Sequence, residues 1–370
     1  MNRIKVMTIF GTRPEAIKMA PLVKELESRE QIESIVCVTA QHRQMLDQVL
    51  DTFSIVPDYD LNIMKAGQTL ADITSRVLQS LDGVISKAKP DLILVHGDTT
   101  TTLSASLAAF YNQVCIGHVE AGLRTYDKYS PFPEEINRQV TGVIADIHFA
   151  PTSVAKENLL KEGNKESSIY VTGNTAIDAL KTTIKEDYHH EILEKIGTDR
   201  IILLTAHRRE NLGEPMKNMF RAIKSIVEEF EDVQVVYPVH LNPLVKKVAD
   251  EIFEKNEKVH LIQPLEVIDF HNFLNKSYII MTDSGGIQEE APSLGKPVLV
   301  LRDTTERPEG VSAGTLKLAG TDEKKIYNLS KELLENKARY NEMSQKANPY
   351  GDGSASKYIV DAIIAKFLAI

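Results

Sequence analysis

The stretch "DLILVHGDTTTT", residues 91–102, joins the patterns of two different secondary structures. Residues 92–95 are continuously apolar, as in a strand that is buried on both faces. Asp98 and the four threonines at 99–102 follow directly, and both residue types are favoured at the start of a helix. The stretch therefore predicts a buried strand that passes into a helix.

The same alternation recurs along the chain. In the first half the expected strands are residues 4–10, 34–40, 91–97, 114–120, 147–152 and 169–174. In the second half they are residues 200–206, 233–239, 259–265, 278–284, 297–303 and 315–320. Apolar runs separated by helix-sized segments indicate βα units and parallel sheets with both faces covered. Right-handed crossovers wind each half into a Rossmann-like, doubly wound domain, so we expect an α/β fold with two such domains.

The composition narrows the class of protein. A chain of 370 residues exceeds the usual single core, which favours two domains, and the charged segment 174–200 has no strand pattern and is expected to join them. The net charge of −9 argues against a nucleic-acid-binding protein. Cys37 and Cys115 lie in apolar runs, which favours reduced core residues of a cytoplasmic protein. The chain has neither a signal-peptide pattern nor an apolar run of about 18 residues, so no membrane association is expected.

Ligands of open α/β sheets bind beyond the carboxyl ends of the strands. Arg13 and Lys18 follow the first strand, where they suit a diphosphate, although a plain turn with two solvated charges has the same pattern. The carboxylates Asp98, Glu120 and Glu134 follow other strands of this half. Crowded carboxylates shift one another's pKa, which suits acid–base catalysis. Asp98 as a helix cap, and one of Glu134 and Glu135 as a structural residue, are the alternatives.

A metal site is the competing interpretation of the first half. His96 shares a strand face with Asp98, and His118 shares one with Glu120, because side chains alternate along a strand. The sequence has no HExxH or CxxC spacing, and strand histidines are commonly core residues. We therefore expect no metal.

The second half has a cationic cluster at its strand ends. His207 and Arg208 follow one strand, and His240 follows the next. Phe270 suits either the core or stacking on a base, and Arg307 follows a later strand. These groups favour an anionic ligand over a merely basic surface loop.

The stretch "TDSGGIQEEAPSLG", residues 282–295, predicts an anion-binding turn at a helix start. The backbone N–H groups of Ser284, Gly285 and Gly286 are expected to bind phosphate. Glu290 lies roughly 6–9 Å further along the helix axis, about the distance from a diphosphate to the ribose hydroxyls of the same nucleotide. Glu289 points about 100° away and is expected to be structural.

Together these motifs resemble one family. "GTRPEAIK", "GDTTTT", "HVEAGLR", "FPEEINR", "TAHRREN", "YPVHLNP", "DSGGIQEEAPSLGKPVLVLRDTTERPE" and "NPYGDG" occur in the order found in non-hydrolysing UDP-N-acetylglucosamine 2-epimerases, from Gly11 to about Gly353. The resemblance implies a GT-B arrangement with the active site in the cleft between the domains. It also implies that the C-terminal helix, residues 355–370, completes an N-terminal domain of residues 1–173, followed by a UDP-binding domain of residues 174–354.

The resemblance further implies a cytoplasmic homodimer whose product, UDP-N-acetylmannosamine, enters cell-surface polysaccharides such as teichoic acid linkage units or capsules. The positions that match the family's ligand residues are Arg13, Lys18, Asp98, Glu120, His207, Phe270, Ser284, Gly286, Glu290 and Arg307. Some members also bind a second UDP-N-acetylglucosamine as an allosteric activator, and the matching positions are Gln41, His42, Gln44, Glu134, Arg208 and His240.

The chemistry favours elimination and re-addition of UDP. Carbon 2 of the sugar has no adjacent carbonyl, so inversion requires either oxidation nearby or elimination. The first turn, "GTRPEA", lacks the G-x-G-x-x-G pattern of a dinucleotide site, so no cofactor is expected. Asp98, Glu120 and Glu134 are the expected proton-transfer groups, with His207 at the departing diphosphate. A hydrolysing epimerase, a GT-B glycosyltransferase and a nucleotide-sugar sensor are the alternatives.

Overall fold

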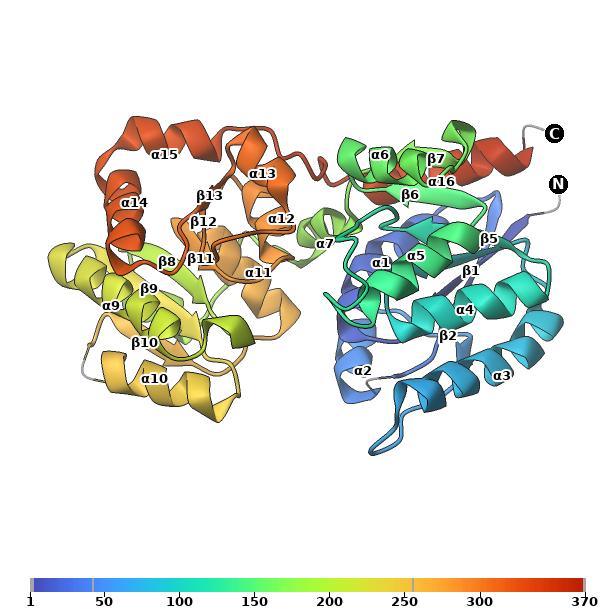
Figure 1. Ribbon diagram of the computed structural model, residues 1–370, viewed down its shortest axis with the longest axis horizontal. Helices are drawn as coiled ribbons and strands as arrows, with labels where there is room; N and C mark the ends of the chain where they lie inside the picture. Colours follow the sequence, from blue (N-terminus) through green and yellow to red (C-terminus); the bar gives the residue numbers. More distant parts are fainter. Residues whose placement is uncertain (1–2, 42, 255, 369–370) are drawn as a thin grey trace. The chain divides into compact units, whose positions relative to one another are not determined.

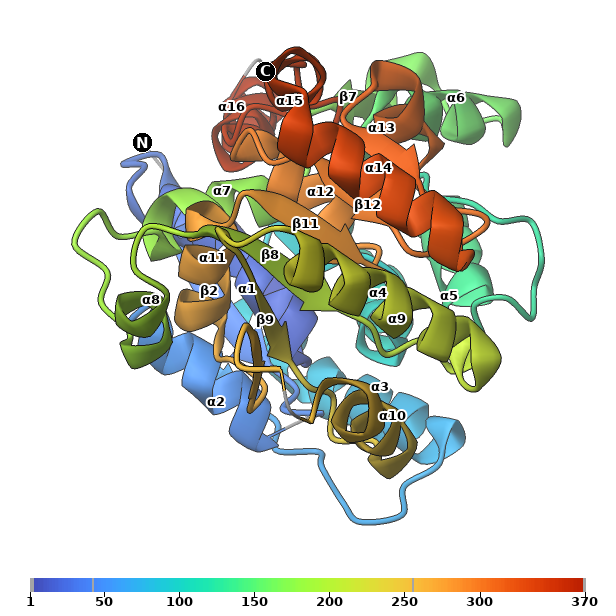
Figure 2. The ribbon, with the colours of Figure 1, turned by 90° about the vertical axis from the view of Figure 1, so that its left-hand side faces the viewer.

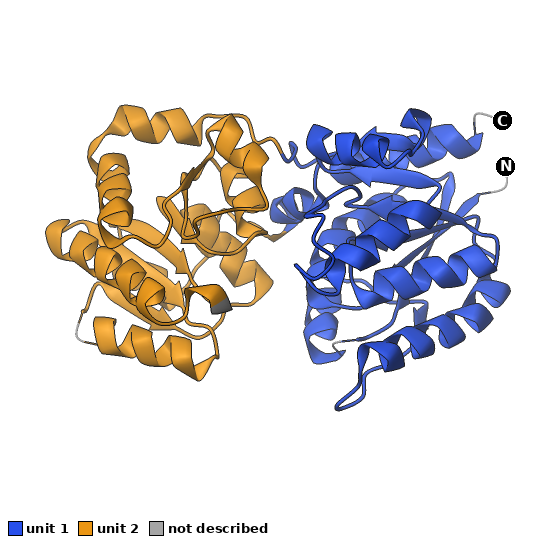
Figure 3. Cartoon of the chain, in the orientation of Figure 1, with its two compact units in different colours: residues 1–182, 350–370 blue, residues 183–349 orange. Residues whose placement is uncertain are grey.

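The computed structural model describes residues 3–41, 43–254 and 256–368, and within these the chain forms two compact units (Figure 3). Unit 1 comprises residues 1–182 and 350–370, and unit 2 comprises residues 183–349. Each unit contains a parallel sheet with helices on both faces (Figure 1). The expected α/β class with two Rossmann-like sheets is therefore confirmed.

The sheet of unit 1 has the strand order β3-β2-β1-β4-β5-β6-β7, and its neighbouring strands are parallel. In β1, Val6 and Phe10 are buried in one hydrophobic cluster, and Met7 and Ile9 in another. This alternation is typical of a strand covered on both faces. The strands are β1 (Ile4–Phe10), β2 (Ile32–Val38), β3 (Tyr59–Asp60), β4 (Leu92–His96), β5 (Cys115–Val119), β6 (Ile147–Ala150) and β7 (Ile169–Val171).

Helices cover both faces of this sheet. The helices are α1 (Arg13–Glu27), α2 (Arg43–Thr52), α3 (Leu70–Ala88), α4 (Thr100–Tyr111), α5 (Glu134–Ile144), α6 (Ser153–Lys161), α7 (Thr175–Thr183) and α16 (Ala355–Leu368), with a 3-10 turn at Glu166–Ser168. Helices α3, α4 and α5 lie side by side on one face (Figure 1). On the other face α1 packs against α16, whose Ile359 and Ile363 are buried with Val6 and Phe10. The last helix is thus part of the core of unit 1.

The sheet of unit 2 has the order β10-β9-β8-β11-β12-β13. Its strands are β8 (Arg200–Thr205), β9 (Val233–Pro238), β10 (Val259–Ile262), β11 (Ile279–Thr282), β12 (Val298–Val300) and β13 (Leu316–Leu318). Its helices are α8 (Glu191–Ile196), α9 (Glu214–Glu229), α10 (Pro243–Phe253), α11 (Val267–Lys276), α12 (Ile287–Ser293), α13 (Pro308–Ala313), α14 (Glu323–Glu335) and α15 (Lys337–Ser344), with a 3-10 turn at Arg209–Asn211. Helices α9 and α14 lie side by side (Figure 2) and share a core with Ile202 and Leu204 of β8.

Every strand expected from the sequence is present in the structure. The strand β3 was not expected, because it is only the pair Tyr59–Asp60 at the edge of the sheet and has no apolar run. Burial raises the pKa of Cys37 and of Cys115 to about 12, so both thiols are protonated. Cys37 is buried in the core as expected, whereas Cys115 is partly buried and packs against it. Among the described residues, no helix combines the length and apolar character that crossing a membrane requires.

The strand order reverses next to the first strand of each sheet. In unit 1 the chain runs outward from β1 to β3 and then returns to β4 on the other side of β1. In unit 2 it runs from β8 to β10 and returns to β11. Ligands of doubly wound sheets bind at the carboxyl ends of the strands at this reversal. The topology therefore directs attention to the loops after β1 and β4, and after β8 and β11.

Buried histidines in β4, β5 and β6 predict that stability falls in mild acid. Burial lowers the pKa of His96 to about 4, of His118 to about 3 and of His148 to about 4. An unfolded histidine titrates near 6.5, so between about pH 6.5 and 4 the unfolded chain binds protons that the folded chain does not. We expect the free energy of unfolding, measured with urea, to decrease steadily over this window.

The variant His118→Gln separates this effect from the titration of carboxylates. Glutamine can still donate to the Gly97 carbonyl, as His118 Nε2 is placed to do at 2.7 Å, but it cannot take up the proton. The decrease between pH 6.5 and 4 should therefore be shallower in the variant. An identical slope in both proteins would contradict the assignment to His118.

Candidate active site

The loop after β1 is fixed by a buried carboxylate. Glu15 accepts hydrogen bonds from the backbone N–H groups of Gly11 (3.1 Å) and Thr12 (2.8 Å), and Thr12 is the N-cap of α1. A Cβ at residue 11 would lie 1.9 Å from Thr39 Oγ1, so this close approach requires glycine. Arg13 then opens α1, and Lys18 follows on the same helix.

Glu15 also connects this loop to the loop after β4. The Thr99 hydroxyl donates to Glu15 at 2.6 Å, and the Thr102 hydroxyl lies 3.2 Å from the same carboxylate. Thr99 is the N-cap of α4 and accepts from the backbone N–H of Thr102. The cap of α4 is therefore Thr99, and the alternative interpretation of Asp98 as the helix cap is wrong.

Asp98 instead pairs with an arginine of α5. Arg138 Nη2 lies 2.7 Å from Asp98 Oδ2, and the Asn137 amide donates to the Asp98 carbonyl at 2.9 Å. Burial raises the pKa of Asp98 to about 6, with further contributions from Glu120 and Glu134, while Arg138 opposes the shift. Asp98 can therefore gain or lose a proton near neutral pH.

Glu120 directly follows β5 and has an unusual backbone. Its φ of 61° lies in the left-handed region, which is costly for a residue with a side chain. Its carboxylate is only 9% exposed and pairs with Lys18 of α1. His96 Nε2, at the end of β4, lies 3.8 Å from Glu120 Oε2, and burial keeps this imidazole neutral by lowering its pKa to about 4. The structure thus brings Lys18, His96 and Glu120 together.

The two glutamates that open α5 differ in their surroundings. Glu135 is fully buried, accepts from the backbone N–H groups of Thr125 and Tyr126 at 3.0 Å each, and lies 3.6 Å from Arg138. Glu135 is therefore the structural member of the pair. Glu134 is half-buried and contributes to the raised pKa of Asp98.

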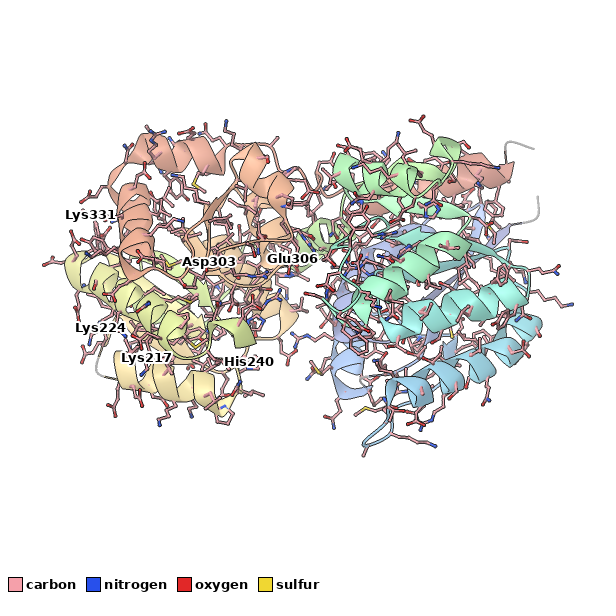
Figure 4. The ribbon with its side chains drawn as sticks, in the orientation of Figure 1. Lys217, Lys224, His240, Asp303, Glu306 and Lys331 are labelled. Carbon is pink, nitrogen blue, oxygen red and sulfur yellow. The ribbon has the colours of Figure 1, made fainter. Side chains whose placement is uncertain are left out.

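In unit 2 a buried aspartate organises the loop after β8. Asp283, immediately after β11, accepts from the backbone N–H groups of His207 and Arg208 at 2.8 Å each. Asp283 Oδ1 also lies 3.2 Å from His207 Nδ1. The His207 ring stacks on that of His240, with 5.5 Å between the ring centroids, and His240 lies after β9 (labelled in Figure 4). Burial would raise the pKa of Asp283, but the hydrogen bonds with His207 and the backbone keep it below its usual value.

Asp283 was missing from the residues predicted from the sequence. The available signal was its place directly after a buried strand, where the other candidate residues lie. Ser284 separates Asp283 from the double glycine, and the phosphate turn predicted from these glycines began at Ser284. A carboxylate would repel a phosphate bound nearby, so Asp283 was not expected at this site; its backbone partners offset its charge.

The turn after β11 leads into the short helix α12. Gly286 is the residue before the helix, and Cβ atoms at Gly285 and Gly286 would have no neighbour nearer than 3.9 Å. Glu289 is 2% exposed and pairs with Arg307, whereas the Glu290 carboxylate lies 3.8 Å from His271 Nε2. A Cβ at either glycine would thus make ordinary van der Waals contact with a glutamate carboxylate, that of Glu306 or Glu290. Glu289 has the structural position expected for it.

The remaining predicted residues fall in both units. Phe270, half-buried on α11, has its ring 6.4 Å from that of His271. Of the predicted regulatory residues, Gln41 accepts from Thr101 at 3.0 Å and Gln44 is exposed on α2, both in unit 1. Arg208 donates to the Asp283 carbonyl at 3.2 Å and belongs to unit 2 with His240. Residue 42 lies outside the described residues.

Among the strand histidines, His118 is hydrogen-bonded to the backbone. His118 Nε2 lies 2.7 Å from the Gly97 carbonyl, where it supports the turn before Asp98. Within residues 3–41, 43–254 and 256–368, no group of three or more His, Cys, Asp or Glu side chains is arranged to bind a metal ion. The ionisable side chains described above are of types suited to proton transfer and to binding an anion.

Comparison with known proteins identifies relatives over almost the whole chain. Residues 24–364 match the family model described as UDP-N-acetylglucosamine 2-epimerase. The UDP-N-acetylglucosamine 2-epimerase of Bacillus subtilis (strain 168) is 69% identical over 364 residues, covering 98% of this chain and 96% of the relative. The crystal structure of a putative UDP-N-acetylglucosamine 2-epimerase from Listeria monocytogenes has a TM-score of 0.96 at 62% identity and covers 100% of this chain and 98% of its own. The Neisseria meningitidis UDP-GlcNAc 2-epimerase, solved bound to UDP-GlcNAc, has a TM-score of 0.87 at 51% identity and covers 98% of this chain and 100% of its own.

The raised pKa of Asp98 predicts a distinct titration. In protein labelled with ¹³C at the aspartate carboxyls, Asp98 should titrate near pH 6, and Asp98→Asn assigns the signal. Because Arg138 opposes the shift, Arg138→Met should raise the midpoint further, whereas Arg138→Lys, which keeps the charge, should raise it less. A midpoint near the ordinary value of about 3.9 would contradict the assignment.

Proposed function

Because the chain belongs to the UDP-N-acetylglucosamine 2-epimerase family, we propose that it interconverts UDP-N-acetylglucosamine and UDP-N-acetylmannosamine by inverting carbon 2 of the sugar. The observation that supports this most directly is the group of ionisable residues at the strand ends of unit 1. There Glu120 pairs with Lys18, and Asp98, with a pKa of about 6, pairs with Arg138. Such a group can both take and return a proton near neutral pH.

The proposed reaction is an elimination followed by re-addition. A carboxylate of unit 1 removes the proton from carbon 2 while the bond from carbon 1 to the diphosphate oxygen breaks, and UDP leaves with the electron pair. The carbon–hydrogen electrons form the double bond of 2-acetamidoglucal. UDP then adds back at carbon 1, and a proton returns to carbon 2 on the opposite face. Asp98, Glu120 and Glu134 are the proposed proton-transfer groups, because two faces require two such groups.

Unit 2 is proposed to bind the nucleotide. The backbone N–H groups of Gly285 and Gly286 suit a diphosphate, whereas that of Ser284, which was expected to join them, donates to Thr282 Oγ1 at 2.9 Å. Glu290 suits the ribose hydroxyls. His207, oriented by Asp283, is proposed to act on the departing diphosphate. In unit 1, Arg13 is proposed as a residue that binds the substrate. Donors placed in advance at a developing negative charge are often the largest catalytic contribution, at about 3–4 kcal/mol each. Phe270 is proposed to stack on the base, and Arg307 to contact the ligand beside Glu289.

The type of reaction, the location, the oligomeric state and the regulation of the enzyme are also proposals. We infer a non-hydrolysing enzyme that acts in the cytoplasm as a homodimer and supplies polysaccharide synthesis at the cell surface. A second UDP-N-acetylglucosamine is proposed as an activator, with Gln41, Gln44, Arg208 and His240 as candidate contacts. His42 belongs to the same proposed set.

One experiment separates the candidate activities. The protein is incubated with UDP-N-acetylglucosamine alone in D₂O and followed by NMR. UDP-N-acetylmannosamine with deuterium at carbon 2 supports the proposal. Free N-acetylmannosamine with UDP supports hydrolysis instead, and unchanged substrate contradicts an epimerase and favours a transferase or a sensor.

Removing the Glu120 carboxylate should abolish most of the turnover. Glu120→Gln keeps the size of the side chain, and general acid–base catalysis typically contributes 10²–10⁴-fold, so we expect kcat to fall by about that factor. Circular dichroism should confirm an unchanged fold, and Glu30→Gln, at an exposed position of unit 1, serves as the control. Near-wild-type turnover of Glu120→Gln would remove this residue from the mechanism.

Glu290→Ala should weaken the binding of UDP selectively. Hydrogen bonds to a charged group are worth about 1.5–3 kcal/mol, so loss of the ribose contact predicts an affinity for UDP about 10- to 100-fold lower by calorimetry. The affinity for pyrophosphate, which has no ribose, should not change. The exposed Glu231→Ala is the control, and wild-type affinity of Glu290→Ala for UDP would contradict the ribose contact.

A further inference from the structure

Asn174, which precedes α7, makes contacts in three directions. It is 2% exposed, and its side-chain amide Nδ2 donates to Glu120 Oε2 at 2.9 Å. Its Oδ1 accepts from the backbone N–H of Ala176 at 2.9 Å, in the manner of a helix cap. Its own backbone N–H donates to the Tyr350 carbonyl at 2.8 Å. Because both polar atoms of its amide are hydrogen-bonded, the Asn174 side chain has little freedom to rotate.

Tyr350 begins the segment by which the chain returns to unit 1. This segment approaches Asn174 closely, because a Cβ added at Gly173 would lie 3.1 Å from the Gly351 Cα. Further along, Asp178 of α7 accepts from the backbone N–H groups of Ala355 (3.2 Å) and Ser356 (2.7 Å). The start of α7 is thus bound to the returning chain at two places.

The other groups around Glu120 fix its orientation less firmly. Lys18, from α1, contacts the same oxygen, but its long side chain has four rotatable bonds. His96, from β4, lies 3.8 Å away, beyond hydrogen-bond distance. Asp98, in the loop after β4, contributes negative charge and is itself paired with Arg138 of α5. Asn174 is a neutral donor whose position is set by its hydrogen bonds with the backbone of Ala176 and of Tyr350.

We propose that Asn174 is a positioning residue that orients the Glu120 carboxylate for proton transfer and ties this orientation to the segment that begins at Tyr350. The proposal rests on the proposed function, since it assigns Asn174 a part in that reaction. Asn174 acts through Glu120 and is not itself a proton-transfer group. Its amide fixes Oε2, while Oε1 lies near the turn at Gly97, within 3.6 Å of where a Cβ of that residue would be.

The variant Asn174→Asp tests this role, because it keeps the capping oxygen and the backbone N–H and replaces the amide donor by a carboxylate that repels Glu120. We expect kcat to fall about 10- to 100-fold, the range typical of losing a hydrogen bond to a charged group, with little change in KM. In protein labelled with ¹³C at the glutamate carboxyls, the Glu120 signal, assigned with Glu120→Gln, should titrate at a higher pH than in the wild type.

The control is Asp178→Asn, which weakens the contact of α7 with Ala355 and Ser356 and leaves the amide of Asn174 in place. It should lower the thermal unfolding midpoint without moving the Glu120 titration. An unmoved Glu120 titration in Asn174→Asp, or an equal shift in Asp178→Asn, would overturn the proposal. The titration needs no substrate, so it gives its answer even if the wild type proves not to be an epimerase.

Discussion

The whole structure depends on a constraint of parallel sheets, in which every strand delivers its carboxyl end to the same edge. Strands covered on both faces have mostly apolar side chains, so the acidic and basic groups of each βα unit collect where the strand ends. In unit 1 this brings Gly11, Asp98 and Glu120 to one edge, and in unit 2 His207 and Asp283. The parallel topology by itself therefore brings the ionisable residues of each unit close together.

Carboxylates at these edges divide into two kinds. Glu15, Glu135 and Asp283 are buried and accept several backbone or hydroxyl hydrogens, so they fix loops. Asp98 and Glu120 instead pair with basic side chains and are the groups proposed to exchange protons. The first kind gives the second its geometry: Glu15 binds the loop after β1 to the start of α4, beside Asp98, and Glu135 lies next to Arg138. A carboxylate beside a proposed phosphate turn is therefore no contradiction, since its charge is satisfied by the backbone.

The strands and the polar loops could be predicted from the sequence. It was harder to predict which of two adjacent residues makes a given contact. Long runs of branched apolar residues have few alternatives to a buried strand, whereas the pair forming β3 depends on its neighbour β2 and has no pattern of its own. Thr99, not Asp98, caps α4, and its hydroxyl is held by a hydrogen bond that it donates to Glu15, which is distant in sequence. The contact from Asn174 to Glu120 spans 54 positions and was equally invisible. Contacts such as these depend on residues that are distant in sequence, so a local sequence pattern does not reveal them.

The left-handed backbone at Glu120 has a consequence for the history of this protein. A side chain in that conformation costs on the order of 1–2 kcal/mol, and glycine would avoid the cost. The backbone conformation alone would thus favour glycine at position 120, whereas the contacts of the side chain with Lys18 and Asn174, and the proposed chemistry, favour the carboxylate. Purifying selection for the reaction must continually oppose a substitution that the backbone would accept. In a descendant freed from that selection, glycine at position 120 would relieve this backbone cost and would lose the contacts with Lys18 and Asn174.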